Sequence, residues 1–135
     1  MKNRILSLLL ALGLVFAFAV NASATELPVE MPDLGEIAAS YDTSDFQIIG
    51  IISDVAEDAG EEDITNAKDL IQQTGANYPH LLLNQSLYIN LVGAIDSVPT
   101  TFFINQEGEV MGYVVGAQSK EAWEEIINDL LAENK

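Results

Sequence analysis

The sequence VPTTFFINQEGEVMGYVV, residues 98–115, contains two apolar runs separated by a short polar link. Thr100–Ile104 and Glu109–Val115 are rich in β-branched and aromatic residues, which favour strands. The link, NQEG at 105–108, ends in glycine, as tight hairpin turns often do. The stretch therefore predicts two antiparallel strands, entered through a loop that contains Pro99.

Helical periodicity appears on both sides of this hairpin. After it, Ser119 is placed to cap a helix whose apolar face includes Trp123. Before it, Glu30–Tyr41 and Ile64–Thr74 also repeat apolar residues at helical spacing, and Gly75 is placed to end the second of these helices. We therefore expect three amphipathic helices.

Further extended segments lie between these helices. Residues 46–53, FQIIGIIS, form a continuous apolar run typical of a strand buried on both faces in a parallel sheet. Residues 54–63 are acidic and predict a loop, 80–83 predict a short strand, and Ser86–Val92 predicts a short helix. The resulting order of helices and strands predicts an α/β fold with a mixed sheet.

These segments resemble those of TlpA/ResA-like thiol–disulfide oxidoreductases, which belong to the thioredoxin-like superfamily. EMPDL at 30–34 is similar to the helix after the active site of that family, and FQIIGI at 46–51 to its second strand. NYP at 77–79 is similar to its Tyr-Pro-x-Leu segment, and residues 98–108 to its cis-proline loop, third strand and hairpin turn. The resemblance covers about residues 30–131 and implies a three-layer α/β/α sandwich.

The resemblance fails at the active site. The family carries a W-C-x-x-C motif just before the helix, and its two cysteine positions fall on Ala24 and Leu27. The chain contains no cysteine, and thiol–disulfide exchange requires a thiolate. We therefore expect a domain related to enzymes of cell redox homeostasis that is itself redox-inactive, with no catalytic residue assigned.

The resemblance also implies a cis bond before Pro99 and a peptide-binding groove beside Val98, Pro99 and Thr100. The alternative interpretation is that Pro99 only shapes the loop, because cis-prolines are ordinarily turn features. The groove would make exported proteins or peptides the natural partners of this chain.

Residues 1–24 have the layout of a secretory signal peptide. Lys2 and Arg4 precede a nearly unbroken apolar run over residues 5–20, and Ala22-Ser23-Ala24 suits cleavage after Ala24. The run is short for a transmembrane helix, so we expect no stable membrane span after cleavage. The prediction is an extracytoplasmic domain over residues 25–135.

The same segment also aligns with the first strand of the family, at about residues 15–20. That strand is central in the thioredoxin-like sheet, so the sheet is predicted to lack it or to form it from the apolar segment. Three outcomes remain open: the segment stays and forms the strand, a partner donates a strand, or the chain is a remnant with an incomplete sheet.

Composition excludes several function classes. With 21 acidic and 5 basic residues the net charge is −16, which is unsuited to nucleic acid. The absence of cysteine and the single histidine, His80, predict neither a metal site nor a cofactor. The acidic segment 54–63 lacks the spacing of a calcium loop and is interpreted as solvated, and His80 as a structural residue with its hydrogen bonds satisfied. The acidic side chains also permit an enzyme that hydrolyses its substrate with carboxylates, but the sequence shows no pair of carboxylates that forms such a site.

Overall fold

The computed structural model describes residues 12–18 and 30–133, with side chains described for 30–133. It contains one five-stranded sheet and four α-helices. The strands are β1 (Leu12–Phe18), β2 (Phe46–Ala56), β3 (His80–Leu83), β4 (Thr100–Ile104) and β5 (Val110–Val115). The helices are α1 (Met31–Ser40), α2 (Glu61–Thr74), α3 (Gln85–Asn90) and α4 (Lys120–Glu133), and a short 3₁₀ helix, η2, spans Val92–Ala94.

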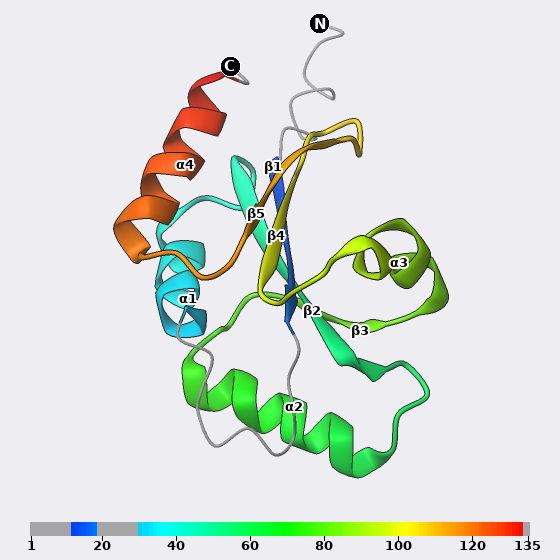
Figure 1. Ribbon diagram of the computed structural model, residues 1–135. Coiled ribbons are helices and arrows are strands. Elements are labelled where there is room, and N and C mark those ends of the chain that lie inside the picture. The colour runs from blue at the N-terminus through cyan, green and yellow to red at the C-terminus, as the bar shows by residue number, and fades with distance from the viewer. Residues whose placement is uncertain (1–11, 19–29, 134–135) are drawn as a thin grey trace, which may run out of the picture.

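The strand order is β3-β2-β1-β4-β5, which places β1 at the centre of the sheet (Figure 1). Strand β1 runs parallel to β2, with Leu12 opposite Phe46, and antiparallel to β4, with Ala17 opposite Thr100. The predicted mixed sheet is therefore confirmed, and the N-terminal apolar segment forms its first strand. The strand spans Leu12–Phe18, so it begins three residues before the predicted range of about 15–20.

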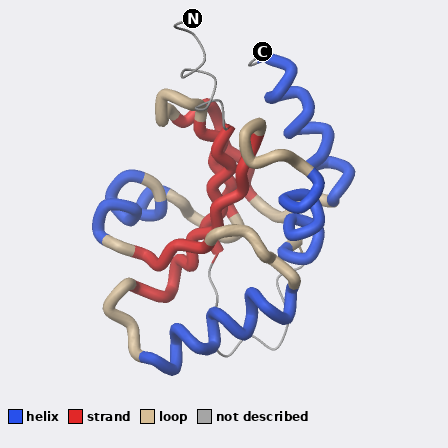
Figure 2. The backbone as a smooth tube through the Cα atoms, turned by 180° about the vertical axis from the view of Figure 1, so that it is seen from behind, coloured by secondary structure: helices blue, strands red, loops and turns tan. Residues whose placement is uncertain are grey.

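Helices cover both faces of the sheet (Figures 1 and 2). Helices α1 and α4 pack on one face around a core that includes Leu34, Phe46 and Trp123, with α2 against the same side. Helix α3 and η2 cover the other face, where Ile51 and Val92 are buried. The side chains of β2 alternate between the two cores, so the predicted three-layer α/β/α sandwich is confirmed.

The acidic segment 54–63 was predicted as one loop, and this prediction is wrong at both ends. Strand β2 continues to Ala56, with Asp54 exposed and Val55 buried, across a register shift against β3. Helix α2 begins at Glu61, because three acidic residues in its first turn interact favourably with the helix dipole. Gly75 ends this helix in the left-handed conformation, as predicted.

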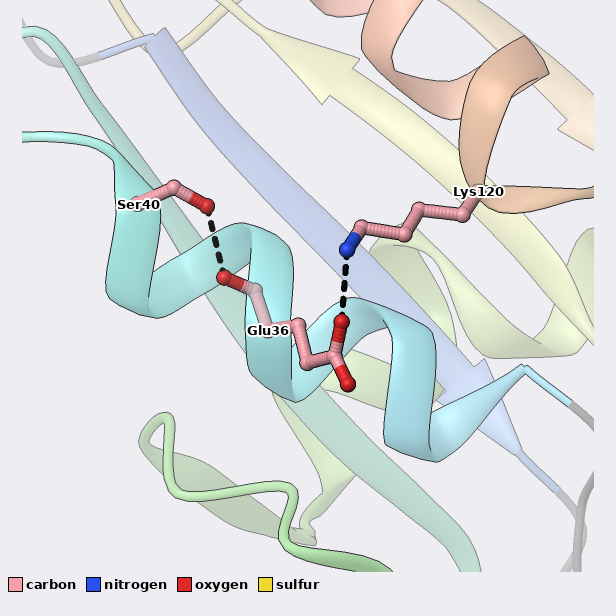
Figure 3. A network of polar contacts seen from close by, with 3 residues as sticks. All are labelled: Glu36, Ser40 and Lys120. Atoms are coloured by element: carbon pink, nitrogen blue, oxygen red, sulfur yellow. Dashed lines mark hydrogen bonds and ion pairs between the residues drawn. The ribbon is translucent and has the colours of Figure 1, made fainter.

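Helices α1 and α4 are joined at their surface and in the core. Figure 3 shows the Lys120 ammonium against the Glu36 carboxylate, beside the hydrogen bond that Ser40 Oγ donates to the Glu36 carbonyl at 2.7 Å. The Glu36 side chain is 68% exposed and that of Lys120 33%, and ion pairs this open to solvent contribute little to stability. Trp123, fully buried between the helices and the sheet, therefore dominates the packing of α4.

A close approach of backbones fixes the position of α1 against the end of α2. A Cβ atom at position 35 would lie 2.2 Å from the Gly75 carbonyl oxygen, so only glycine fits at Gly35.

Among the residues that the structure describes, no helix is long and apolar enough to cross a membrane.

Candidate functional site around the Pro99 loop

The loop before β4 lies at the end of the sheet where β1 ends. The Val98–Pro99 peptide bond is cis, and the Pro99 carbonyl accepts a hydrogen bond from the Gly116 N–H at 2.9 Å. Thr100 is buried, and its hydroxyl donates to the Ser97 carbonyl at 2.7 Å. These bonds hold the loop against β5 and against its own preceding turn.

Val98 is the exposed apolar residue of this loop, next to exposed Asp96 and Ser97. Its side chain is 39% exposed, whereas Thr100 and Thr101 at the start of β4 are buried. Within residues 12–18 and 30–133, neither its N–H nor its carbonyl has a hydrogen-bond partner. Val98 therefore presents an apolar side chain and two backbone groups that an extended peptide could pair with.

Glu30, at the start of α1, is a buried carboxyl group close to this loop. Its Oε2 accepts hydrogen bonds from the Gln118 N–H at 3.0 Å and from the Trp123 Nε1–H at 3.2 Å. Its Oε1 is buried without a hydrogen-bond partner in the described part of the chain. Burial raises the pKa of Glu30, and the two donors oppose that shift only in part.

The segment between β5 and α4 connects Glu30 to the Pro99 loop. Gly116, with φ of 91°, binds the Pro99 carbonyl, and Gln118, two residues later, binds Glu30. The left-handed conformation at Gly116 turns the chain between these two contacts. Glu30 and the Pro99 loop are therefore parts of one hydrogen-bonded constellation at this end of the sheet.

Val98, Pro99 and Thr100 lie in the loop before β4, and their role in peptide binding stays a prediction. The family cysteine positions, Ala24 and Leu27, lie outside the described residues. Sequence reasoning missed Glu30, which was read only as the start of a helix. A carboxylate immediately before the Met31-Pro32 helix start was the available signal, because acidic residues favour that end of a helix.

His80 differs from its predicted role as a satisfied structural residue. Its Nδ1 lies 2.7 Å from the Tyr78 carbonyl, but its Nε2 is buried without a hydrogen-bond partner among the described residues. The ring stacks on that of Tyr78 and fills the space above Gly50. Burial lowers the pKa of His80, which favours the neutral form of the ring.

The polar side chains of the Pro99 loop are the Ser97 and Thr100 hydroxyls and the exposed Asp96 carboxylate, and the buried Glu30 carboxyl group is linked to the loop through residues 116–118. No nucleophile and base are in contact here within the described ranges. Residues 30–133 also contain no group of three side chains placed to hold a metal ion. A separate small hollow of about 180 Å³ lies between α1 and the start of β2, and its lining includes Gly35, Phe46 and Tyr78.

Comparisons with curated proteins point to thiol–disulfide oxidoreductases. The chain is 30% identical over 95 residues to the thiol-disulfide oxidoreductase ResA of Bacillus anthracis, covering 70% of this chain and 50% of that protein. It is also 30% identical over 101 residues to ResA of Bacillus cereus, covering 75% of this chain and 54% of that protein. The chain thus spans about half the length of the curated relatives it matches. No protein-family model matches it.

Solved structures agree on the fold. A thiol:disulfide interchange protein of the thioredoxin family from Chlorobium tepidum superposes with a TM-score of 0.70 at 25% identity, covering 90% of this chain and 80% of that one. A secreted Mycobacterium tuberculosis disulfide oxidoreductase, homologous to Escherichia coli DsbE, gives 0.63 at 13% identity, covering 87% and 80%.

The order of strands, the loop before β4 and the sequence relatives all lead to one assignment. The chain is a member of the thioredoxin-like superfamily, related to ResA-type thiol–disulfide oxidoreductases over about half of their length, and it contains no cysteine.

Proposed function

We propose that this chain is an extracytoplasmic thioredoxin-like domain that does not exchange disulfides. One observation carries the proposal: no position of the 135 residues is a cysteine. Exchange proceeds through attack by a thiolate and a mixed disulfide, and no other side chain of the chain can form either. Glu30 and the Pro99 loop remain, but neither supplies a redox group.

Insulin reduction tests this proposal directly. Dithiothreitol is the electron donor in this assay. We expect insulin to precipitate at the same rate with the full chain as in buffer that contains dithiothreitol but no protein. The Ala24→Cys/Leu27→Cys double variant is the matched comparison, because it returns thiols to the aligned positions without other changes. A rate clearly above buffer for the cysteine-free chain would contradict the proposal.

We further propose that the Pro99 loop binds extended peptides without reacting with them. The specific observation is Val98, whose exposed side chain stands beside backbone groups without partners among the described residues. An extended peptide could pair with these groups as a strand does. Burial of Thr100 and the Pro99–Gly116 hydrogen bond keep the loop rigid, which reduces the entropy lost on binding.

Amide shifts in the ¹⁵N-labelled full chain can locate such binding. On titration with an uncharged extended peptide, we expect the largest changes at residues 97–100. Val98→Asp places a charge at the contact and is expected to weaken binding at least about fivefold, the equivalent of about 1 kcal/mol. Ala94→Asp, at an exposed position in η2, is the control. Changes confined to other residues, or equal binding by both variants, would count against the loop.

Export is the remaining part of the proposal. Support comes from the layout of residues 1–24 and from the description of one structural relative as secreted. Cell fractionation with intact-mass measurement tests it: the chain should be recovered outside the cytoplasm. The measured mass also distinguishes a chain that begins at Thr25 from one that keeps residues 12–18.

A further inference from the structure

Strand β5 forms one edge of the sheet and carries no charged residue. Its sequence is VMGYVV, and four of its six residues carry exposed apolar side chains: Val110, Met111, Tyr113 and Val115. Soluble proteins usually protect sheet edges with charges, prolines or very short strands. The opposite edge, β3, is only four residues long. Edge β5 is therefore the one that is open to another strand.

The register of the β4–β5 ladder shows which backbone groups are available. Gly116 donates its N–H to the Pro99 carbonyl. Because backbone groups alternate in direction along an antiparallel ladder, those of Val114 and Gly112 also point toward β4. Tyr113 and Val115 lie between them and direct their N–H and C=O groups away from the sheet. Neither residue has a partner there among the described residues.

The same two residues offer side chains for an incoming strand. Tyr113 is 65% exposed and Val115 54%, and both lie on the α3 face of the sheet, where the Tyr113 ring is 6.2 Å from that of Phe102. Helix α3 is short and leaves this end of the face uncovered (Figure 1). Backbone groups and apolar side chains thus coincide at the same two positions, as β-augmentation requires.

Charge identifies the kind of partner. Residues 30–133 contain two Lys or Arg residues, Lys68 and Lys120. The same range contains 20 of the 21 acidic residues of the chain. Exposed Glu107 and Glu109 lie at one end of β5, and exposed Asp96 lies in the loop that leads to Pro99 at the other. A second copy would bring equal negative charge to this edge. A cationic polypeptide would meet complementary charge at both ends.

From this combination we propose that the outer edge of β5 binds an extended segment of a basic polypeptide that alternates apolar and positively charged residues. The segment adds a sixth strand beside Tyr113 and Val115. This inference does not depend on peptide binding at Val98, because the two surfaces use different backbone groups.

The test uses the full chain and a short fluorescent peptide that alternates lysine with valine, with a glutamate–valine peptide as its counterpart. We expect saturable binding of the first peptide only, weakened by high salt. Tyr113→Lys removes a cross-strand contact and adds repulsion, and it should weaken binding at least about fivefold. Tyr88→Lys, at an exposed tyrosine on α3 away from the edge, is the matched control and should bind as the unmodified chain does.

Melting curves establish that both variants fold, and Val115→Lys replaces Tyr113→Lys if that variant does not. Equal loss of binding in Tyr88→Lys would show nonspecific attraction to an acidic surface and overturn the inference. So would equal binding of the two peptides. Sedimentation of the chain alone provides the last outcome: a dimer that Tyr113→Lys abolishes would assign the edge to a second copy and also overturn it.

Discussion

A chain that lacks residues 1–24 is expected not to fold. Removal of this segment deletes β1, which pairs with β2 through seven residues and with β4 through five. The facing backbone groups of β2 and β4 lose their partners, and the two halves of the sheet lose their connection. Domains of this size have a free energy of unfolding of only about 5–15 kcal/mol. We expect the loss of both ladders of β1 to cost more than this margin.

Circular dichroism and urea unfolding of purified chains provide the measurement. Residues 25–135 should show no cooperative transition, whereas a chain that lacks only residues 1–11 keeps β1 and should retain one. A cooperative, monomeric transition from residues 25–135 would show that the sheet closes without β1. Restoration of folding by an added peptide with the sequence of residues 12–18 would identify the missing strand as the cause.

Trp123→Ala is expected to destabilise the domain by about 3–5 kcal/mol. The indole is fully buried in the main core and packs against Phe103 at 6.4 Å between ring centroids. Its loss leaves a cavity between α4, α1 and the sheet, and it also removes one of the two donors to Glu30 Oε2. The free energy of unfolding from urea titration measures the sum of both effects.

Two further variants separate these contributions. Trp123→Phe keeps most of the buried ring but removes the Nε1–H, so it should cost less than Trp123→Ala and raise the pKa of Glu30 further. Tyr88→Ala removes a 55% exposed aromatic and should change stability by no more than about 0.5 kcal/mol. A loss below about 1 kcal/mol for Trp123→Ala would contradict the core role of the indole.

Most of the architecture was predictable because its signals are local. The helices α1 and α4, the strand β4 and the hairpin follow from periodicity and turn residues within a few positions of one another. The element boundaries around residues 54–63 were not predictable from local signals. The acidic composition is the same for a loop as for the end of β2, which pairs with β3, and for the start of α2, which its acidic first turn stabilises. Composition alone cannot distinguish a solvated loop from these two termini.

The candidate site was predictable only where a motif marks it. Val98, Pro99 and Thr100 follow from one segment, but Glu30 gains its environment from Gln118 and Trp123, which are 88 and 93 positions away in the sequence. His80 stacks on Tyr78, which is only two residues away, but only the fold places its ring above Gly50 and leaves its Nε2 buried without a hydrogen-bond partner among the described residues. Hydrogen-bond satisfaction of a single side chain is a property of the packed structure and not of its neighbours in sequence.

The central position of β1 has a consequence for the order of folding during synthesis. The strand is made first, yet Gly13 pairs with Ile104, so its second neighbour emerges from the ribosome only when most of the chain has been translated. Contacts of such long range form slowly and late. Until then β1 can pair only with β2, so the sheet stays open beside the N-terminal apolar segment through most of synthesis. If this segment acts in export, as proposed, it must do so within that time window, before β4 closes the sheet around it.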